Sequence, residues 1–306
     1  MVKKLRSEFN HHVKGEGKMF FNGHKSLNVL LKTTVTIAIL IFITAFIQPA
    51  FADGLLAKIK QDKKLVVGTE AALEPMEFVK GGKIIGYGKD FLDIIVTDLD
   101  VKLVQHDLPF QGIIPGLLAK KFDMVATSVA PNEERVKKVA YTLPLAAVNY
   151  DIVVLAKNKD IKSQYDLNGK VVATQLASSP QPVLEKFNDE LKAKGGSGYK
   201  QLALYQAFPE TYIALASGQV DAICIATISF AALNKKRPGV YKIIGSIGNP
   251  VWFCWITRPE DLDVRDYINS MILKLRDNGK LYELQKKWLG TVQKIPDGGH
   301  LPPGAF

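Results

Sequence analysis

The 306-residue sequence contains few cysteines and histidines, and this scarcity excludes several kinds of site. Its two cysteines, Cys224 and Cys254, lie in the apolar contexts I-C-I and F-C-W, and no histidine stands at ligand spacing from them. A zinc motif is therefore excluded, and we expect neither a metal site nor a cofactor. The favoured interpretation of the two cysteines is that they are small buried hydrophobic residues, while a single disulfide between them stays open.

The sequence also lacks long runs of one charge. Residues 1–52 hold seven basic and two acidic residues, so they supply half of the net charge of +10. The rest of the chain carries 33 basic and 28 acidic residues, which are scattered and are not interleaved with aromatic residues. This distribution argues against a nucleic-acid-binding surface. A hydrophobic content of 47% with 23% charged residues is typical of a soluble globular protein and argues against a multi-span membrane protein.

One long hydrophobic run is present, at residues 33–47, and Lys25 and Lys32 precede it. A membrane-spanning helix needs roughly 20 apolar residues, which is more than this run contains. A basic segment followed by a short apolar run is the layout of a secretory signal. A retained membrane anchor is the less favoured alternative.

The residues after this run match a cleavage site. Ala50 and Ala52 give the small-x-small pattern that precedes the cut in signal peptides. We therefore interpret residues 1–52 as a signal peptide that is cleaved after Ala52, which makes Asp53 the first residue of the mature chain. Because the charged segment before the apolar run is unusually long, Met19 is an alternative start.

The chain after residue 53 alternates between strand and helix patterns. We expect a helix at residues 55–60, a strand at 64–70, a strand that passes into a helix over 83–99, and a strand at 101–105. Apolar residues recur at helical spacing in the third segment, and short apolar runs bounded by turn residues mark the strands. This order predicts an α/β fold, and the chain length fits about two domains.

The stretch from Phe110 to Arg135 has the pattern of a short helix, a buried strand and a polar turn. The strand predicted at 124–126 is followed by Thr127 and Ser128, and open α/β sheets bind ligands at the carboxyl ends of their strands. Arg135 is the predicted start of another helix, and its planar guanidinium suits a carboxylate or a phosphate. The pattern predicts an anion clamp. A surface arginine on a solvated helix face is the alternative.

A second candidate anion site lies at Ser178, Ser179 and Pro180, which resemble a helix N-cap followed by proline in the first turn. The unpaired N–H groups and the dipole of a helix start attract anions. We therefore expect this helix start to complete the clamp that begins at Arg135. An ordinary helix cap is the alternative.

Two units of the sequence resemble each other. The segments K-K-F-D-M-V-A at residues 120–126 and S-G-Q-V-D-A-I at 217–223 each place an aspartate, Asp123 or Asp221, at the start of an apolar strand. A short carboxylate in this position tends to bond nearby backbone amides. We therefore expect both aspartates to be structural, and the repeated unit suggests two similar lobes.

From about residue 64 to 289 the chain resembles the extracytoplasmic solute-binding proteins of the polar amino acid type, family 3, that serve ABC transporters. The order and spacing of several motifs carry this resemblance. They are V-G-T-E-A-A-L-E-P-M-E-F with G-Y-G-K-D-F, F-Q-G-I-I-P-G-L-L-A-K-K-F-D, N-E-E-R, D-L-N-G-K-V-V-A, L-A-S-G-Q-V-D-A and L-R-D-N-G-K-L-Y-E-L-Q-K-K-W-L-G.

The resemblance implies a type II periplasmic-binding-protein fold, in which two α/β lobes joined by a two-strand hinge close on a small ligand. It implies a monomer without enzyme activity that works in the periplasm and passes its ligand to an ABC transporter permease in the inner membrane. The implied parts are residues 53–148 for the first part of lobe 1, 149–250 for lobe 2, 251–290 for the return to lobe 1, and 291–306 for a flexible tail.

The resemblance also implies roles for single residues. Arg135 falls on the position that binds the α-carboxylate of the ligand, and Ser128 on a neighbouring contact position. Phe110 falls where an aromatic ring packs on the ligand, and Ser179 on a hydroxyl position in lobe 2. Glu70 lies where related proteins carry an acid for a cationic side chain. These residues together imply a ligand that carries a carboxylate.

The chain departs from the family pattern at several of its site positions. The aspartate that pairs with the α-amino group is replaced by Ala226, the aromatic residue of the first loop by Leu73, and a first-lobe serine by Ala130. Two positions that are normally glycine hold Trp252 and Cys254.

Loss of the aspartate bears on the ligand, because an ammonium buried without a carboxylate partner is costly. Either Glu70 binds the amine instead, or the amine is substituted and faces Trp252 or Trp255, since aromatic faces attract alkylated ammonium groups. Packing of both tryptophans in the core is the alternative. We expect a carboxylate-bearing ligand that is cationic or N-substituted, of the amino acid type.

Two other functions stay open. A dehydratase-like periplasmic enzyme on the same scaffold would need a general acid or base in the cleft, and His106, Glu70 and Glu74 are the candidates. No pair of a nucleophile and a base stands at a recognisable spacing, which disfavours an enzyme. A detached sensor lobe is the third alternative.

Overall fold

The computed structural model describes residues 54–296, which belong to one compact unit, Asp53–Phe306. The predicted signal peptide, its cleavage site and residues 297–306 lie outside the described residues. Within the described part, none of the helices has both the length and the apolar character that crossing a bilayer requires.

The strands form one large mixed sheet and one small sheet. In the large sheet the order is β10-β9-β11-β8-β12-β6-β1-β5, and β7 pairs with β12. We call the part around β5, β1 and β6 lobe 1 and the part around β10, β9 and β11 lobe 2. The strands of the large sheet are β1 (Lys64–Thr69), β5 (Lys102–Asp107), β6 (Met124–Val129), β7 (Ala140–Tyr141), β8 (Ala146–Leu155), β9 (Val171–Gln175), β10 (Gln201–Tyr205), β11 (Ala222–Ala226) and β12 (Tyr241–Thr257).

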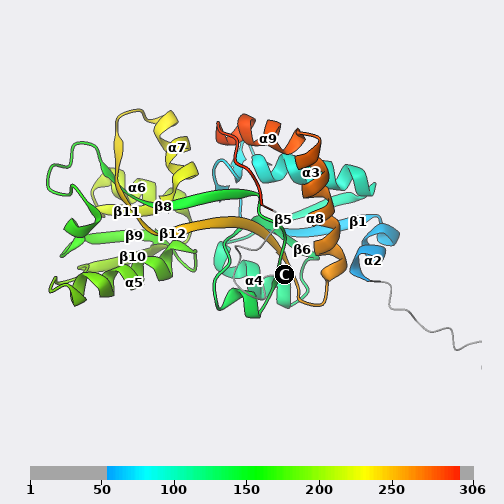
Figure 1. Ribbon diagram of the computed structural model, residues 1–306, viewed down its shortest axis with the longest axis horizontal. Helices are drawn as coiled ribbons and strands as arrows, with labels where there is room; N and C mark the ends of the chain where they lie inside the picture. Colours follow the sequence, from blue (N-terminus) through cyan, green and yellow to red (C-terminus); the bar gives the residue numbers. More distant parts are fainter. Residues whose placement is uncertain (1–53, 297–306) are drawn as a thin grey trace, which may run out of the picture. The chain divides into compact units, whose positions relative to one another are not determined.

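Helices pack on both groups of strands (Figure 1). Lobe 1 carries α2 (Leu55–Asp62), α3 (Tyr87–Leu99), α4 (Ile113–Leu118), α8 (Leu262–Asp277) and α9 (Lys280–Leu289). Lobe 2 carries α5 (Pro180–Ala193), α6 (Phe208–Ser217) and α7 (Thr227–Lys236). Short 3-10 helices span Phe110–Gly112, Arg135–Lys137 and Gln164–Leu167, and the small antiparallel sheet consists of β2 (Ala72–Leu73), β3 (Glu77–Lys80) and β4 (Lys83–Ile85).

Two long strands connect the lobes. Figure 1 shows β8 and β12 running side by side between the two groups of strands. They pair antiparallel from Tyr241 opposite Leu155 to Phe253 opposite Ala146, with register shifts between Ile243 and Gly245 and between Ile247 and Val251. The boundaries expected at 148/149 and 250/251 fall inside these two strands. The chain therefore has the two-lobed α/β fold with a two-strand hinge that the family resemblance implies.

The two structural aspartates confirm the internal similarity of the lobes. Asp123 Oδ2 accepts a hydrogen bond from Val66 N at 2.8 Å, and Asp221 Oδ2 accepts one from Val171 N at the same distance. The backbone N–H of each aspartate donates in return to the carbonyl of the same partner residue. Each carboxylate thus ties the start of its own strand to the strand beside it, as predicted.

The sequence prediction of a helix starting at Arg135 is wrong. The structure has a single 3-10 turn at Arg135–Lys137. The chain then enters β7 at Ala140, which pairs with Thr257 of β12. Only two residues separate the turn from this strand, so a regular helix has no room to form.

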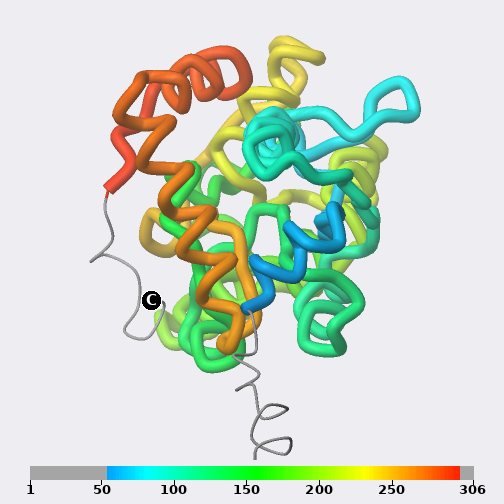
Figure 2. Tube along the Cα trace, turned by 90° about the vertical axis from the view of Figure 1, so that its right-hand side faces the viewer, coloured from blue at the N-terminus to red at the C-terminus, as the bar shows by residue number. Residues whose placement is uncertain are grey.

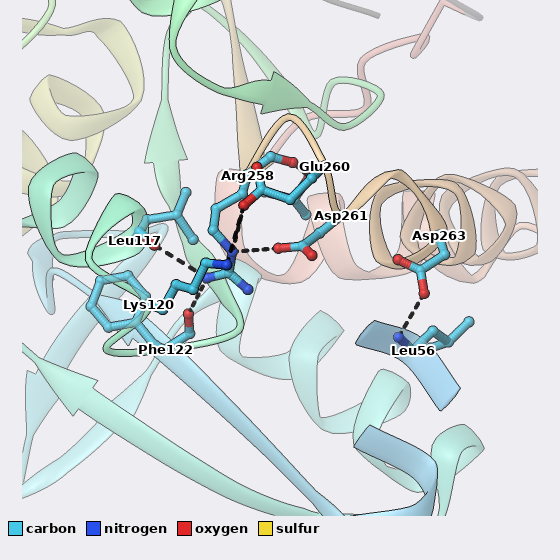
Figure 3. Close-up of polar contacts among 9 residues, drawn as sticks. Leu56, Leu117, Lys120, Phe122, Arg258, Glu260, Asp261 and Asp263 are labelled. Carbon is cyan, nitrogen blue, oxygen red and sulfur yellow. Dashed lines mark hydrogen bonds and ion pairs between the residues drawn. The ribbon is translucent and has the colours of Figure 1, made fainter. Parts of the chain in front are cut away.

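The far end of β12 is fastened to lobe 1 by a buried arginine (Figure 3). Arg258 is 4% exposed, and its Nη1 donates to the carbonyl of Phe122 at 2.7 Å and to that of Leu117 at 3.2 Å. Its Nε forms an ion pair with Asp261 at 2.5 Å. Asp263 then accepts from Leu56 N at 2.7 Å, and α2 and α8 lie side by side (Figure 2). These contacts anchor one end of the hinge.

The segment after α9 packs against the other hinge strand. The side chain of Gln293 accepts from Ala147 N at 2.7 Å and donates to Ala147 O at 2.9 Å. Ile295 is 2% exposed. The tail expected from residue 291 therefore begins with a segment that contacts β8 through Gln293.

Both cysteines are buried free thiols. Cys224 lies on β11 and Cys254 on β12, and each is fully buried. Burial raises the pKa of both thiols. This confirms their interpretation as small buried hydrophobic residues.

Candidate functional site

A small cavity lies between the lobes, and its walls come from both of them. We call it the inter-lobe cavity. Its lining is largely apolar with a few polar groups, which is the composition of small-molecule sites. It is lined by Glu70, Leu73, Phe110, Ser128, Tyr150, Gln175, Ser178, Ser179, Pro180, Phe208, Ala226 and Phe253.

Of the eight predicted site residues, five line this cavity and three do not. Glu70, Phe110, Ser128, Ser178 and Ser179 stand in its wall. The other three lie behind the wall or beside it, and they are Thr127, Arg135 and Trp252.

Arg135 stands directly behind one of the lining hydroxyls and bridges the lobes. Its side chain is buried, and its Nη1 donates to Ala130 O at 2.9 Å and to Ser179 Oγ at 2.6 Å. Nη2 donates to Ala177 O at 2.8 Å, and the guanidinium carbon lies 5.4 Å from the ring centre of Phe110. Three acceptors of the chain itself therefore hold the guanidinium in place.

The start of α5 differs from the predicted arrangement. Ser179 precedes the helix but makes no side-chain cap bond. Pro180 and Pro182 have no N–H, and Gln181 N donates to Ser178 O at 3.3 Å. The first turn thus offers few free N–H groups to an anion, contrary to the sequence prediction. Since Ser179 Oγ accepts from Arg135, its own hydroxyl proton is available to a ligand in the cavity.

The hydroxyls at the end of β6 contact a buried acid that the sequence prediction missed. Ser128 Oγ donates to Glu77 Oε2 at 3.2 Å, and Thr127 Oγ1 donates to Glu70 O at 3.3 Å and lies 3.5 Å from Glu77 Oε2. Burial raises the pKa of Glu77 to about 8, against the opposing effect of its hydrogen bond from Ser128. This acid supports β6 from outside the cavity.

Glu70 and Gln175, one from each lobe, also line the cavity and contact each other. Gln175 Nε2 donates to Glu70 Oε1 and, at 3.0 Å, to Gln206 O. Gln175 is fully buried and Glu70 is 4% exposed. Burial raises the pKa of Glu70 to about 7, its hydrogen bond from Gln175 opposes this, and the negative charge of Asp107 adds to the rise.

The tryptophans on β12 do not face the cavity. Trp255 is fully buried, and its ring centre lies 5.1 Å from that of Phe91 in the core of lobe 1. Trp252 is partly buried and packs against the hydrophobic cores. The residue of β12 that lines the cavity is Phe253, next to Trp252 in the sequence. Trp255 is therefore a core residue, which is the alternative that the sequence analysis gave for it.

The position of the missing aspartate lies in the cavity wall. Ala226 ends β11 and lines the cavity, as does Leu73, which replaces the expected aromatic residue. Glu70 is the acid in this lining. A cation in the cavity therefore has one carboxylate beside it.

Several lining residues escaped the sequence prediction, namely Tyr150, Gln175, Phe208 and Phe253. Gln175 could have been predicted by the same argument as Thr127 and Ser128, namely that ligands bind at the carboxyl ends of strands in an α/β sheet. Gln175 is the last residue of the apolar strand β9. No comparable signal marks the three aromatic residues, which read as ordinary core positions.

Two further contacts join the lobes around the cavity. Lys236 of α7 forms an ion pair with Glu74, and Gln111 Nε2 donates to Gln206 Oε1 at 2.8 Å. Among the described residues, no group of three or more His, Cys, Asp or Glu side chains could hold a metal ion. The described arrangement is that of a cavity closed by both lobes, which suits a small organic molecule.

A two-lobed fold with a hinge and a buried inter-lobe cavity defines the class of solute-binding proteins. The model of the bacterial extracellular solute-binding proteins, family 3, matches residues 65–291. The chain belongs to this family.

Known proteins resemble it over most of its length. The probable amino-acid-binding protein YxeM of Bacillus subtilis (strain 168) is 28% identical over 244 residues, which are 78% of this chain and 89% of that protein. The P235GK mutant of ArgBP from T. maritima is 30% identical with a TM-score of 0.68, covering 77% and 99% of the two chains. The ancestral amino acid-binding protein AncCDT-1, a precursor of cyclohexadienyl dehydratase, is 26% identical with a TM-score of 0.68 and the same coverage.

Proposed function

We propose that this protein captures an amino acid or an N-substituted relative of one and delivers it to the permease of an ABC transporter. The observation that carries the proposal is the inter-lobe cavity, whose wall holds two polar pairs. One is Glu70 with Gln175, which we call the Glu70 end, and the other is Ser179 with Arg135 behind it, which we call the Ser179 or Arg135 end. The name of the Bacillus subtilis relative, a probable amino-acid-binding protein, supports this class of ligand.

The carboxylate of the ligand binds at the Ser179 end. The Ser179 hydroxyl accepts from Arg135 at 2.6 Å and can donate its own proton into the cavity. A hydrogen bond from the guanidinium polarises this hydroxyl, and the positive charge behind it offsets the negative charge of the carboxylate. With its bond to Ser179 intact, Arg135 stabilises the ligand carboxylate through the Ser179 hydroxyl. If the carboxylate replaces Ser179 as the acceptor, the guanidinium binds the carboxylate directly.

The nitrogen of the ligand binds at the Glu70 end. Ala226 provides no carboxylate, so Glu70 is the charge partner in the cavity lining that an ammonium or guanidinium would need in a buried site. The aromatic and aliphatic side chains between the two ends, among them Phe110 and Phe208, pack against the carbon skeleton.

The export of the protein is part of the same proposal. Residues 1–52 act as a signal peptide that is removed after Ala52, and the mature protein works as a monomer in the periplasm beside an inner-membrane permease. Intact-mass measurement of the protein recovered from the periplasm tests the cleavage. A mass that begins at Asp53 supports it, and a retained residue 1 or 19 contradicts it.

An enzyme on the same scaffold is the second candidate, because AncCDT-1 is a precursor of a dehydratase and because the pKa of Glu70 lies near 7. That pKa suits a general acid or base. The other candidates do not line the cavity: His106 is exposed on β5, and Glu74 pairs with Lys236. Incubation with carboxylated cyclohexadienyl rings should therefore leave these compounds unchanged, and their turnover would favour the enzyme.

A thermal-shift screen of the mature protein tests the proposed function. Amino acids, betaines, ectoines, opines and other small carboxylates are added to ligand-stripped protein. A compound at 100 times its Kd should raise Tm by roughly 5–10 °C, because it binds only the native state. We expect the shift with a compound that has both a carboxylate and a cationic nitrogen. No shift with any compound, or a shift only with compounds that lack a carboxylate, contradicts the proposal.

A further inference from the structure

We propose that Gln175 is a specificity-determining residue, which selects ligands whose cationic nitrogen carries N–H groups over ligands whose nitrogen is fully alkylated. The inference rests on the proposed function and narrows its ligand class. It starts from one atom, the side-chain oxygen of Gln175, which is buried in the wall of the inter-lobe cavity and has no hydrogen-bond partner.

The neighbours of Gln175 fix the orientation of its amide. The nitrogen faces two acceptors, Glu70 Oε1 and the carbonyl oxygen of Gln206. A rotated amide would place its oxygen against the carbonyl oxygen of Gln206, which cannot donate, and against the Glu70 carboxylate, which cannot donate when it is ionised, so both bonds would be lost. The atom left without a partner is therefore the oxygen, which can only accept a hydrogen bond.

This oxygen is a buried acceptor to which no group of the described chain donates. Gln175 is fully buried at the end of β9. Buried polar side-chain atoms in native proteins nearly always have a partner, and one that lacks a partner in a binding cavity points to the missing ligand. A ligand N–H satisfies it.

The position of the oxygen relative to Glu70 defines the ligand group. Both side chains line the same cavity and are joined by a hydrogen bond. An ammonium or guanidinium has at least two N–H donors, so it can place one on the Glu70 carboxylate and another on the Gln175 oxygen. A quaternary nitrogen has none, and it would leave the buried oxygen unpaired.

The aromatic lining offers the competing arrangement, in which ring faces hold an alkylated nitrogen. Trp252 and Trp255 lie outside the lining, so this arrangement would depend on Tyr150, Phe110, Phe208 and Phe253. Tryptophan faces attract cations best among the aromatic side chains, and the lining has none, whereas the unpaired oxygen acts specifically on N–H. The structure thus favours the protonated nitrogen.

Calorimetric titration of the mature protein with three probes tests the inference. The probes are L-lysine, its Nα-trimethyl form and its Nε-trimethyl form. For the wild type, one of the two trimethyl forms should bind at least about tenfold more weakly than L-lysine, since it leaves a buried acceptor unpaired. The form that is rejected shows which nitrogen lies between Glu70 and Gln175.

Two matched variants assign the discrimination to Gln175. Gln175→Met keeps a similar volume but removes the acceptor, so L-lysine and the rejected form should then differ by less than about threefold. Gln206→Met makes the same chemical change at an exposed side chain outside the cavity lining, and it should keep the wild-type discrimination.

The outcomes separate this inference from the proposed function. Equal binding of all three probes by the wild type overturns the inference and leaves the proposed function standing. Discrimination by Gln175→Met that matches the wild type also overturns the inference. If that variant does not fold, the wild-type comparison decides alone. Failure of all three probes to bind the wild type overturns the inference, because the cavity then does not accept the cationic nitrogens of lysine, and the wider thermal-shift screen still decides the proposed function.

Discussion

The two polar pairs in the wall of the inter-lobe cavity, Ser179 with Arg135 and Glu70 with Gln175, differ in how far the protein satisfies their hydrogen-bonding groups. At the Arg135 end, the guanidinium donates to Ala130 O, Ala177 O and Ser179 Oγ, so the chain already supplies its acceptors. At the Glu70 end, Gln175 gives both donors of its amide to the chain and keeps a free oxygen.

This difference suggests that the two ends recognise their groups by different means. A ligand carboxylate at the Arg135 end must share the guanidinium with the chain's own acceptors or replace one of them. Arg135 therefore contributes to binding mainly through its positive charge and by joining the two lobes. A nitrogen at the Glu70 end meets an acceptor that has no other partner, so this end contributes selectivity. The following predictions alter one end at a time.

The largest effect is expected from Arg135→Met. It removes the positive charge behind Ser179 and the bonds that join the lobes, so ligand affinity should fall by at least about 100-fold. Because Arg135 is buried and its loss leaves buried carbonyls unpaired, the free energy of unfolding should also fall, by about 1–3 kcal/mol. Calorimetric titration and thermal unfolding measure the two effects.

Arg135→Lys is the matched control, since it keeps a charge but not the planar fork. It should recover part of the affinity that Arg135→Met loses. Wild-type affinity in Arg135→Met would contradict the carboxylate clamp.

A smaller loss is expected from Glu70→Gln at the other end. Removing the carboxylate beside the ligand nitrogen should weaken binding of a cationic amino acid by about 30-fold, measured at pH 8. Glu74→Gln is the control, because Glu74 pairs with Lys236 and does not line the cavity. If Glu74→Gln weakens binding as much as Glu70→Gln does, affinity depends on the total negative charge near the cavity and not on a contact between Glu70 and the ligand nitrogen.

The pH dependence of binding should follow the protonation of Glu70. Burial raises its pKa from the ordinary 4.5 to about 7, so without ligand the side chain is mostly protonated below pH 7. Its contribution makes the unliganded fold less stable as pH rises from 4.5 to 7. A bound cation stabilises the ionised form, so affinity should rise by up to about 30-fold from pH 5.5 to 8 and then level off.

Titration calorimetry at these pH values checks this expectation, and Glu70→Gln should remove the dependence. Glu77 also has a raised pKa, near 8, but it lies outside the cavity. A pH dependence that survives in Glu70→Gln would assign it to Glu77 or another group.

The smallest effect is expected from Lys236→Met. This variant breaks the ion pair with Glu74 that joins α7 to lobe 1, but the lysine side chain is 59% exposed. Exposed ion pairs contribute about 1 kcal/mol or less, so the rate of ligand release should rise no more than about fivefold. Stopped-flow competition measures this rate. A larger increase would show that the ion pair is a main lock of the closed form.

Much of the fold could be predicted from local pattern. Asp123 and Asp221 precede apolar strands, and each bonds the backbone of the neighbouring strand. Ser128, near the end of β6, and Ser179, just before α5, were selected from such patterns, and both line the cavity. These features depend on a few adjacent residues, which the sequence displays directly.

The finer geometry of the cavity depends on register and backbone angles that the sequence does not display. Phe253 lines the cavity while Trp252 does not, and a shift of one residue reverses the faces of a strand. The register of β12 changes between Ile247 and Val251, so counting alternate residues along this strand fails. Ala177 has a φ of 59°, unusual for alanine, and its carbonyl accepts from Arg135.

The central claim is that one ligand uses both ends of the cavity, and a paired thermal-shift measurement tests it most directly. Each cationic L-amino acid is compared with its methyl ester, which keeps the nitrogen groups but removes the carboxylate charge. The account predicts a Tm shift of roughly 5–10 °C for at least one free acid at saturation and a much smaller shift for its ester. Equal shifts for acid and ester, or no shift with any of these acids, would contradict it.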